Sequence, residues 1–230
     1  SYTEGMLYNH GVQGVMDLSN LLCRRGRQFE VVAGFLNEKN PEYPSLCRRV
    51  TDFAKAAVIR HKLSKARVGI VGDPFVGMGD FGIPFETLRE TIGLEVVPYD
   101  LQDYTYLDSV TQEEIDAEYA ANSERFEMKV PREVYDFSTR VSLAVRKWLA
   151  DKKLDAFSMN FKAARNGTSF PTMPFAEASL AMERGIGYAG EGDVLTAAFV
   201  SALMEAFDEV SFTEIFCPDW KDGSLFMSHM

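Results

Sequence analysis

Cysteine is scarce in this sequence, and its three cysteines lie far apart, at Cys23, Cys47 and Cys217. Without the short paired spacings of disulfide frameworks or zinc sites, these cysteines predict neither kind of cross-link. A protein that needs no disulfides suits a reducing compartment, so we expect it in the cytoplasm. No apolar run approaches the ~18 residues of a membrane span, and the start lacks the charged and apolar regions of a signal peptide. We therefore expect a soluble protein with no membrane partner.

Basic residues are also in deficit, because 24 lysines and arginines face 34 aspartates and glutamates, which gives a net charge of −10. Such a field repels phosphate backbones and argues against nucleic acid as a partner. Hydrophobic residues make up 46% of the chain and charged residues 25%, the balance of an ordinary globular protein. A length of 230 residues predicts one large or two modest domains. Because the chain begins without methionine and ends in an apolar run, we interpret it as a fragment.

Hydrophobic periodicity predicts an alternation of helices and strands along most of the chain. The first part has a predicted helix over 12–25, a strand over 29–36 and a second helix that Pro44 opens. The next part has predicted strands at 68–72, 94–99 and 156–161, and predicted helices at 84–92, 113–126, from 131 onward, at 175–184 and at 194–207. Since strands that alternate with helices pair in parallel, we predict a doubly wound, Rossmann-like α/β domain. Beyond residue 208, predicted strands at 210–216 and 225–230 flank a turn at Asp222-Gly223.

Two carboxylates are candidates for a functional site. Glu191 lies between two glycines just before the helix predicted at 194–207. Small neighbours would let a large ligand approach this carboxylate, although an acid near a helix start can also serve only the helix dipole. Glu214 shares one face of its predicted strand with Phe212 and Phe216. If that face is buried the carboxylate needs a partner, and if the strand lies at an edge the carboxylate faces solvent.

His229 adds a third candidate, because it follows the predicted turn and can return beside Glu214 if the two strands pair. A lone histidine is more often structural. Two carboxylates and an imidazole, however, suit an octahedral Mn²⁺, Co²⁺ or Mg²⁺ ion better than a thiolate-rich zinc site.

These residues lie in three motifs that resemble those of sugar isomerases of the L-arabinose and L-fucose isomerase type, in the same order. The family motif AEGDWKTAA, which holds a metal glutamate, is similar to GEGDVLTAA at 190–198. A second family glutamate follows in SFME, similar to SFTE at 211–214. A family histidine follows in GSHM, similar to MSHM at 227–230. The chain departs from the family where Val194-Leu195 replace Trp-Lys, which leaves the identity of the sugar open.

The resemblance implies a metal-dependent aldose–ketose isomerase for a pentose or a deoxyhexose, of the type that converts L-arabinose to L-ribulose. Glu191, Glu214 and His229 would bind a divalent metal, Mn²⁺ in the first place and Co²⁺ or Mg²⁺ as alternatives. A fourth metal ligand, a histidine, would lie beyond Met230. The two glutamates would also transfer protons through a cis-enediol intermediate, with a metal-assisted hydride shift as the alternative chemistry.

The resemblance further implies that Phe75 and Phe161 line the sugar pocket, although a role in the core is an alternative for either ring. His10 would reach the active site of a neighbouring subunit in a trimer-based homo-oligomer. The implied domains are the end of an N-terminal α/β domain at 1–64, a central α/β domain at 65–208, and the start of a β-rich C-terminal domain at 209–230.

Two other classes of protein stay open. Residues 77–82, GMGDFG, fit the G-x-G-x-x-G pattern of dinucleotide-binding loops, and Asp100 lies where a ribose-binding acid would be expected. This reading predicts an NAD-dependent oxidoreductase. Against it, residues 73–76 separate the predicted strand from the first glycine, whereas the fingerprint needs a tight turn directly after the strand. The third class is a non-catalytic sugar-binding module, because a fold does not fix a function.

Overall fold

The computed structural model describes residues 11–34, 37–79 and 81–228, with the side chains of 11 and 12 left out. The chain divides into two compact units, Ser1–Val58 and Ile59–Met230. This division falls inside a helix. It does not test the domain boundaries expected near residues 64 and 208, which stay predictions. Within the described residues, no helix has both the length and the apolar character that a membrane crossing requires.

The first unit contains helix α1 (Gly11–Arg24) and most of helix α2 (Tyr43–Leu63), as the sequence predicts. The strand predicted at 29–36 is wrong, because residues 29–34 form no strand and the last two positions lie outside the described residues. A strand needs a neighbouring strand for its hydrogen bonds, and the described part of this unit offers none. The segment packs along α2 instead, where Gly34 lies close against Leu46 and Glu30 pairs with Arg49 at 2.6 Å.

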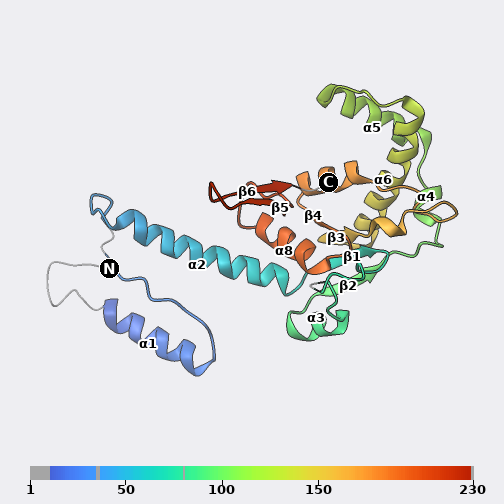
Figure 1. The fold of residues 1–230 in the computed structure, drawn as a ribbon. Helices are drawn as coiled ribbons and strands as arrows, with labels where there is room; N and C mark the ends of the chain where they lie inside the picture. The colour runs from blue at the N-terminus through green and yellow to red at the C-terminus, as the bar shows by residue number, and fades with distance from the viewer. Residues whose placement is uncertain (1–10, 35–36, 80, 229–230) are drawn as a thin grey trace. The chain divides into compact units, whose positions relative to one another are not determined.

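The second unit is built on a parallel sheet whose described strands follow the order β2-β1-β3-β4 (Figure 1). The strands are β1 (Arg67–Val71), β2 (Glu95–Pro98), β3 (Ala156–Met159) and β4 (Gly187–Gly190). Three of them confirm predicted strands, whereas β4 was missed. Two glycines hide its strand pattern, and Gly187 is needed there because an added Cβ would lie 2.4 Å from the carbonyl oxygen of Ala197.

Helices cover both faces of this sheet, which confirms the doubly wound α/β fold (Figure 1). The helical segments are α3 (Phe85–Thr91), α4 (Thr105–Asp108), α5 (Gln112–Arg125), α6 (Arg132–Lys152), the 3₁₀ turn η2 (Phe161–Ala163), α7 (Phe175–Glu183) and α8 (Val194–Met204). One core cluster joins α6 and α7 to a sheet face that includes Phe157. The other joins α3 and α8 to the opposite face, which includes Ala156. Adjacent residues of β3 thus enter opposite cores, as the strand period requires.

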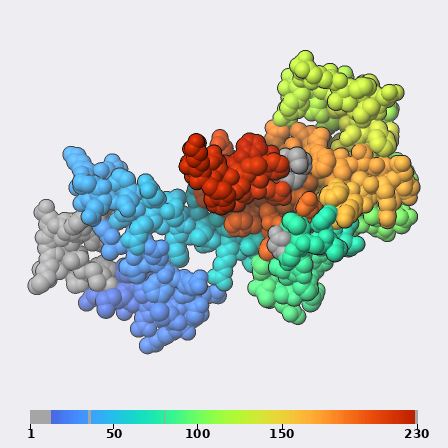
Figure 2. All heavy atoms as spheres, in the orientation of Figure 1, coloured from blue at the N-terminus to red at the C-terminus, as the bar shows by residue number. Residues whose placement is uncertain are grey.

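The chain continues into an antiparallel hairpin of β5 (Glu214–Asp219) and β6 (Ser224–Ser228), with the predicted turn between them. β5 begins later than the predicted strand at 210–216, and a bulge between Ile215 and Cys217 interrupts its register. Every residue of β5 is exposed, and the hairpin lies on the visible surface in red (Figure 2). A two-stranded hairpin without a further layer is marginally stable in water.

Candidate functional site

Three of the predicted site residues gather at one edge of the sheet. Phe75 follows β1, Phe161 follows β3 and Glu191 follows β4, so all three lie at carboxyl ends of parallel strands. The chain runs from β1 to β2 on one side and then returns to β3 on the other side of β1. In open α/β sheets, the crevice at such a reversal of strand order is the usual ligand site.

The two aromatic side chains lie together at this edge. The ring centroids of Phe75 and Phe161 are 5.5 Å apart, with the rings tilted by 34°. The ammonium group of Lys162 lies 4.2 Å from the centroid of the Phe75 ring, within cation–π range. Phe161 is 46% exposed, so it is not a core residue of the described chain. The pair therefore forms an accessible apolar wall with a cation at one end.

Glu191 is held in an unusual backbone conformation. Its φ of 61° lies in the left-handed region, which among the described non-glycine residues only Lys153 shares. The Phe75 N–H donates to the Glu191 carbonyl oxygen at 2.9 Å, and the Gly192 N–H donates to the Ser158 hydroxyl at 2.9 Å. Non-glycine residues in this region cost on the order of 1–3 kcal/mol and cluster at functional sites.

The neighbours of Glu191 have structural roles of their own. Gly192 has a φ of 89°, and an added Cβ would lie 2.6 Å from the Cα of Pro74. This glycine therefore admits the loop after β1, and the approach of a ligand to the Glu191 carboxylate stays a prediction. The Asp193 carboxylate accepts from the Thr196 N–H at 2.9 Å and caps α8, as predicted. Because Asp193 serves the helix end, the Glu191 carboxylate is not needed there.

Glu214 lies on the exposed face of the hairpin, so the alternative of a solvent-facing carboxylate holds in the described chain. Phe212 is half-buried and its ring lies 5.9 Å from that of Tyr188, edge to face. Burial raises the pKa of the Tyr188 hydroxyl, and the negative charges of Glu191 and Glu214 raise it further. Tyr188 thus lies in the electrostatic field of both carboxylates.

Predicted residues His229 and His10 lie outside the described residues. Ser228, the last described residue, pairs with Glu214 across the hairpin. In the part that the structure describes, no three His, Cys, Asp or Glu side chains form a metal-binding group. The donors that are described, the two carboxylates, fit a hard divalent cation in their chemistry.

The dinucleotide alternative lacks the geometry that it needs. Residues 72–76 lie between the end of β1 and Gly77, so the segment GMGDFG does not follow the strand directly. An added Cβ at Gly77 or Gly79 would meet nothing within 4 Å, so neither glycine is required by close packing. Asp100 accepts a hydrogen bond from the Gln102 N–H at 2.8 Å, which is a local turn.

Sequence reasoning missed three polar residues around the site: Ser158, Asn160 and Lys162. The Asn160 side-chain amide donates to the Asp73 carbonyl oxygen at 2.6 Å, and the Ser158 hydroxyl contacts the turn of Glu191. The sequence does carry a signal for two of them. Ser158 and Asn160 are polar residues at alternate positions, one within an otherwise apolar strand and one directly after it.

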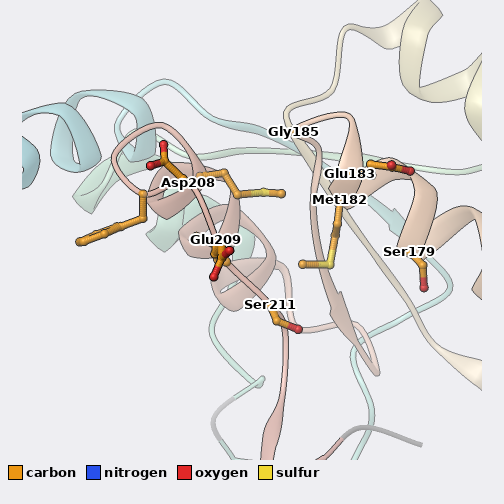
Figure 3. A pocket seen from close by; sticks show the side chains of 10 residues that line it. Ser179, Met182, Glu183, Gly185, Asp208, Glu209 and Ser211 are labelled. Atoms are coloured by element: carbon orange, nitrogen blue, oxygen red, sulfur yellow. The ribbon is translucent and has the colours of Figure 1, made fainter.

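A cavity of about 760 Å³ lies elsewhere, beside α7. In Figure 3, Ser179, Met182 and Glu183 of α7 face Asp208, Glu209 and Ser211 of the segment after α8. A smaller cavity of about 410 Å³ adjoins it and is lined in part by Tyr188 and Phe212. Neither includes Phe75, Phe161 or Glu191. We place the candidate site at the carboxyl edge of the sheet, because that is where the strained carboxylate lies.

The fold and this site define a doubly wound α/β protein with a carboxylate and aromatic side chains at its switch point. Residues 87–208 match the family of the L-arabinose isomerase central domain, and the chain belongs to that family. The resemblance to L-arabinose isomerases that the sequence motifs indicate is therefore confirmed.

Curated relatives agree with this assignment. L-arabinose isomerase 2 of Bacillus licheniformis is 24% identical over 98% of this chain and 48% of its own length. L-arabinose isomerase of a Nocardioides species is 24% identical over 94% of this chain and 43% of its own. L-arabinose isomerase of Leuconostoc mesenteroides is 28% identical over 55% of this chain and 28% of its own. At its best coverage, the chain thus spans about half the length of these relatives.

Proposed function

We propose that the protein that contains this chain is a metal-dependent aldose–ketose isomerase acting on a pentose or a deoxyhexose. The observation that carries the proposal is Glu191, a carboxylate in a left-handed turn at the switch point of the sheet, beside Phe75. Membership of the L-arabinose isomerase central-domain family supports the proposal, as do relatives that are named L-arabinose isomerases.

Glu191, Glu214 and His229 would hold a divalent cation, with Mn²⁺ as the first candidate and Co²⁺ and Mg²⁺ as alternatives. When bound, such an ion supplies Lewis acidity to the oxygens of the sugar. The aromatic wall of Phe75 and Phe161 would pack against carbon atoms of the substrate and exclude water on that side.

The two glutamates would carry the protons. The reaction moves a carbonyl from C1 to C2, so one proton leaves C2, one is returned to C1, and one hydroxyl proton passes from O2 to O1. One carboxylate would remove the C2 proton to give a cis-enediol and return it to C1, while the other would serve the hydroxyl groups.

The test uses the full-length gene product, meaning the polypeptide that contains these 230 residues. After treatment with a chelator, the protein is assayed for ketose formation from L-arabinose, L-fucose and other pentoses and deoxyhexoses, with Mn²⁺, Co²⁺ or Mg²⁺ added back. We expect turnover that is lost with the chelator and restored by one of these ions. Sugar binding without turnover under every condition would reject an isomerase and support a non-catalytic module.

A further inference from the structure

The turn that carries Glu191 is joined to the neighbouring strand by one side chain. Ser158 of β3 is fully buried, and its hydroxyl lies 2.8 Å from the Ala189 carbonyl oxygen and 3.0 Å from that of Gly190. The same oxygen accepts from the Gly192 N–H at 2.9 Å. One hydroxyl thus donates to the end of β4 and accepts from the turn that follows it.

This bond spans the strained part of the backbone. Glu191 and Gly192 both have positive φ values, 61° and 89°, so two successive residues turn in the left-handed region. β4 ends at Gly190, so the sheet supplies no regular partner to the buried N–H of Gly192. A buried N–H without a partner destabilises the conformation that buries it. The Ser158 hydroxyl removes that cost and so favours the turn.

The other side of the turn is anchored from β1. The Phe75 N–H donates to the Glu191 carbonyl oxygen at 2.9 Å, and the backbone of Pro74 packs against Gly192. With the Phe75 contact on one side and the Ser158 contact on the other, the peptide groups around Glu191 have little freedom to rotate. The direction of the Glu191 Cα–Cβ bond, from which the carboxylate extends, is then set by the backbone on both sides.

We infer that Ser158 is a positioning residue, which aims the Glu191 carboxylate at the site by fixing the left-handed turn from Gly190 to Gly192. This inference rests on the proposed function, because it assumes that Glu191 binds the ion. It differs from a merely structural role in one respect: loss of the hydroxyl should affect ion binding more than it affects folding.

Ser142 offers a matched control. It is also buried, and its hydroxyl donates to the Ser138 carbonyl oxygen at 3.1 Å within α6. Ser142→Ala and Ser158→Ala therefore remove the same atom from buried sites, but only Ser158 contacts the turn of Glu191. Both variants are made in the full-length gene product and compared for thermal unfolding, Mn²⁺ affinity, kcat and KM.

We expect Ser158→Ala to weaken Mn²⁺ binding by roughly 10- to 100-fold, the range typical of residues that orient metal ligands. Its kcat should fall with little change in KM, whereas Ser142→Ala should retain both Mn²⁺ affinity and kcat. Wild-type Mn²⁺ affinity in Ser158→Ala would overturn the inference. The inference would also be overturned if both variants lost Mn²⁺ affinity and kcat only in proportion to the decrease in their unfolding temperatures.

Amide hydrogen exchange separates this inference from the proposed function. Peptides that cover residues 188–195 should exchange faster in Ser158→Ala than in the wild type. In Ser142→Ala, these peptides should exchange at the wild-type rate. If the wild type binds none of Mn²⁺, Co²⁺ and Mg²⁺, the proposed function fails, yet faster exchange in this segment would still uphold the positioning of the turn. Unchanged exchange in Ser158→Ala would refute the positioning role whatever the protein binds.

Discussion

Glu191 has a backbone conformation that costs free energy to form. Among the described residues, no local contact explains why a glutamate side chain is needed at this position. A residue that served only the start of α8 would not need a φ of 61°, because Asp193 already caps that helix. The chain also uses a glycine on each side of Glu191, and close packing against Pro74 explains Gly192. A left-handed carboxylate at the switch point is therefore best understood through what it binds.

The first prediction concerns the two carboxylates. Glu191→Gln and Glu214→Gln in the full-length gene product should each lower kcat by at least ~10²-fold, because an amide cannot accept the transferred proton. His229→Asn should mainly weaken Mn²⁺ binding. Glu209→Gln, an exposed carboxylate outside the site, is the control and should keep normal turnover. Near-normal turnover by either site variant would remove that glutamate from the mechanism.

The second prediction distinguishes proton transfer from a hydride shift. When the isomerisation runs in D₂O, exchange of the proton held by a carboxylate allows solvent deuterium to enter C1 of the ketose. A hydride shift carries the substrate hydrogen across without exchange. We expect deuterium in the product, measured by NMR or mass spectrometry. Full retention of the substrate hydrogen would favour the hydride shift.

The third prediction concerns the aromatic wall. Phe161→Leu should change the relative kcat/KM for different aldoses and leave Mn²⁺ affinity intact, because apolar pocket walls discriminate by roughly 1–3 kcal/mol per methylene. The measurements are kcat/KM for a pentose and a deoxyhexose and a direct Mn²⁺ titration. A folded variant that lost both metal and turnover would show that Phe161 does more than shape the pocket.

At the residue scale, the sequence predicted what is locally encoded. Glu191 stood out because its glycines and the helix cap at Asp193 are adjacent to it. Its place just before a helix was confirmed, whereas the strand that precedes it was missed. Ser158 did not stand out as its partner, because it is 34 positions from Gly192 and only the pairing of β3 with β4 brings the two together. Contacts of that kind depend on strand order, which periodicity does not contain.

At the scale of elements, regular helices and apolar strands were predictable and close packing was not. α6 shows its apolar face in the sequence. Val141, Val145 and Trp148 of that face are buried, whereas Val134 and Phe137 near the helix start are about half exposed. β4 does not, because the approach of α8 requires glycine where a strand would normally carry a branched residue. The apolar run at 29–34 failed as a strand for the opposite reason, since pattern alone supplies no neighbouring strand.

An ion cluster joins three helices of the second unit. Glu177 of α7 is fully buried, and the Arg146 guanidinium of α6 donates to it at 2.7 Å and to Glu118 of α5 at 2.8 Å. Arg184 also pairs with Glu177. A buried carboxylate is tolerated only when it is paired and hydrogen-bonded, so Arg146 holds this region of the fold together.

The fourth prediction is that Arg146→Met lowers the free energy of unfolding by about 3 kcal/mol, because it leaves the buried Glu177 with fewer partners. Arg125→Met is the matched control, since Arg125 pairs with Glu183 at 3.0 Å but both side chains are about half exposed. That change should cost less than about 1 kcal/mol. Urea unfolding measures both, and equal losses would show that burial adds nothing to the Arg146 cluster.

The same cluster should make stability depend on pH. Hydrogen bonds from Arg146 lower the pKa of the Glu118 carboxyl below its ordinary value. A carboxyl with a lowered folded-state pKa contributes stability above its unfolded pKa and loses that contribution as the pH falls through the folded pKa. Between about pH 5 and pH 3, the wild type should therefore lose more stability than Arg146→Met. Parallel losses in the two proteins would contradict this linkage.

At the scale of the whole molecule, the site is unevenly supported. Glu191 and the aromatic wall lie on loops of a sheet with helices on both faces, whereas Glu214 lies on an exposed hairpin. Trp220 at the tip of that hairpin is 88% exposed and Phe226 is 60% exposed. A preorganised metal site needs all its ligands held on rigid elements. For the metal site proposed above, the loop after β4 would meet that requirement at Glu191, and the hairpin by itself would not meet it at Glu214.

The last prediction is that residues 1–230 expressed alone fold in the second unit but do not isomerise sugars. The chain spans 48% of the relative in Bacillus licheniformis, and the family resemblance implies a fourth metal ligand beyond Met230. With Glu214 on a marginal hairpin, the ion would lose both a ligand and the rigidity of another, and binding should weaken accordingly. Circular dichroism should show a folded α/β protein, while Mn²⁺ titration and ketose formation should both fall far below those of the full-length gene product. The isolated chain also serves as its own control for folding, because the Arg146 cluster and the parallel sheet lie entirely within it. Robust isomerisation by these residues alone would mean that the active site is complete without a ligand beyond Met230, and the four-ligand site that the resemblance implies would be wrong.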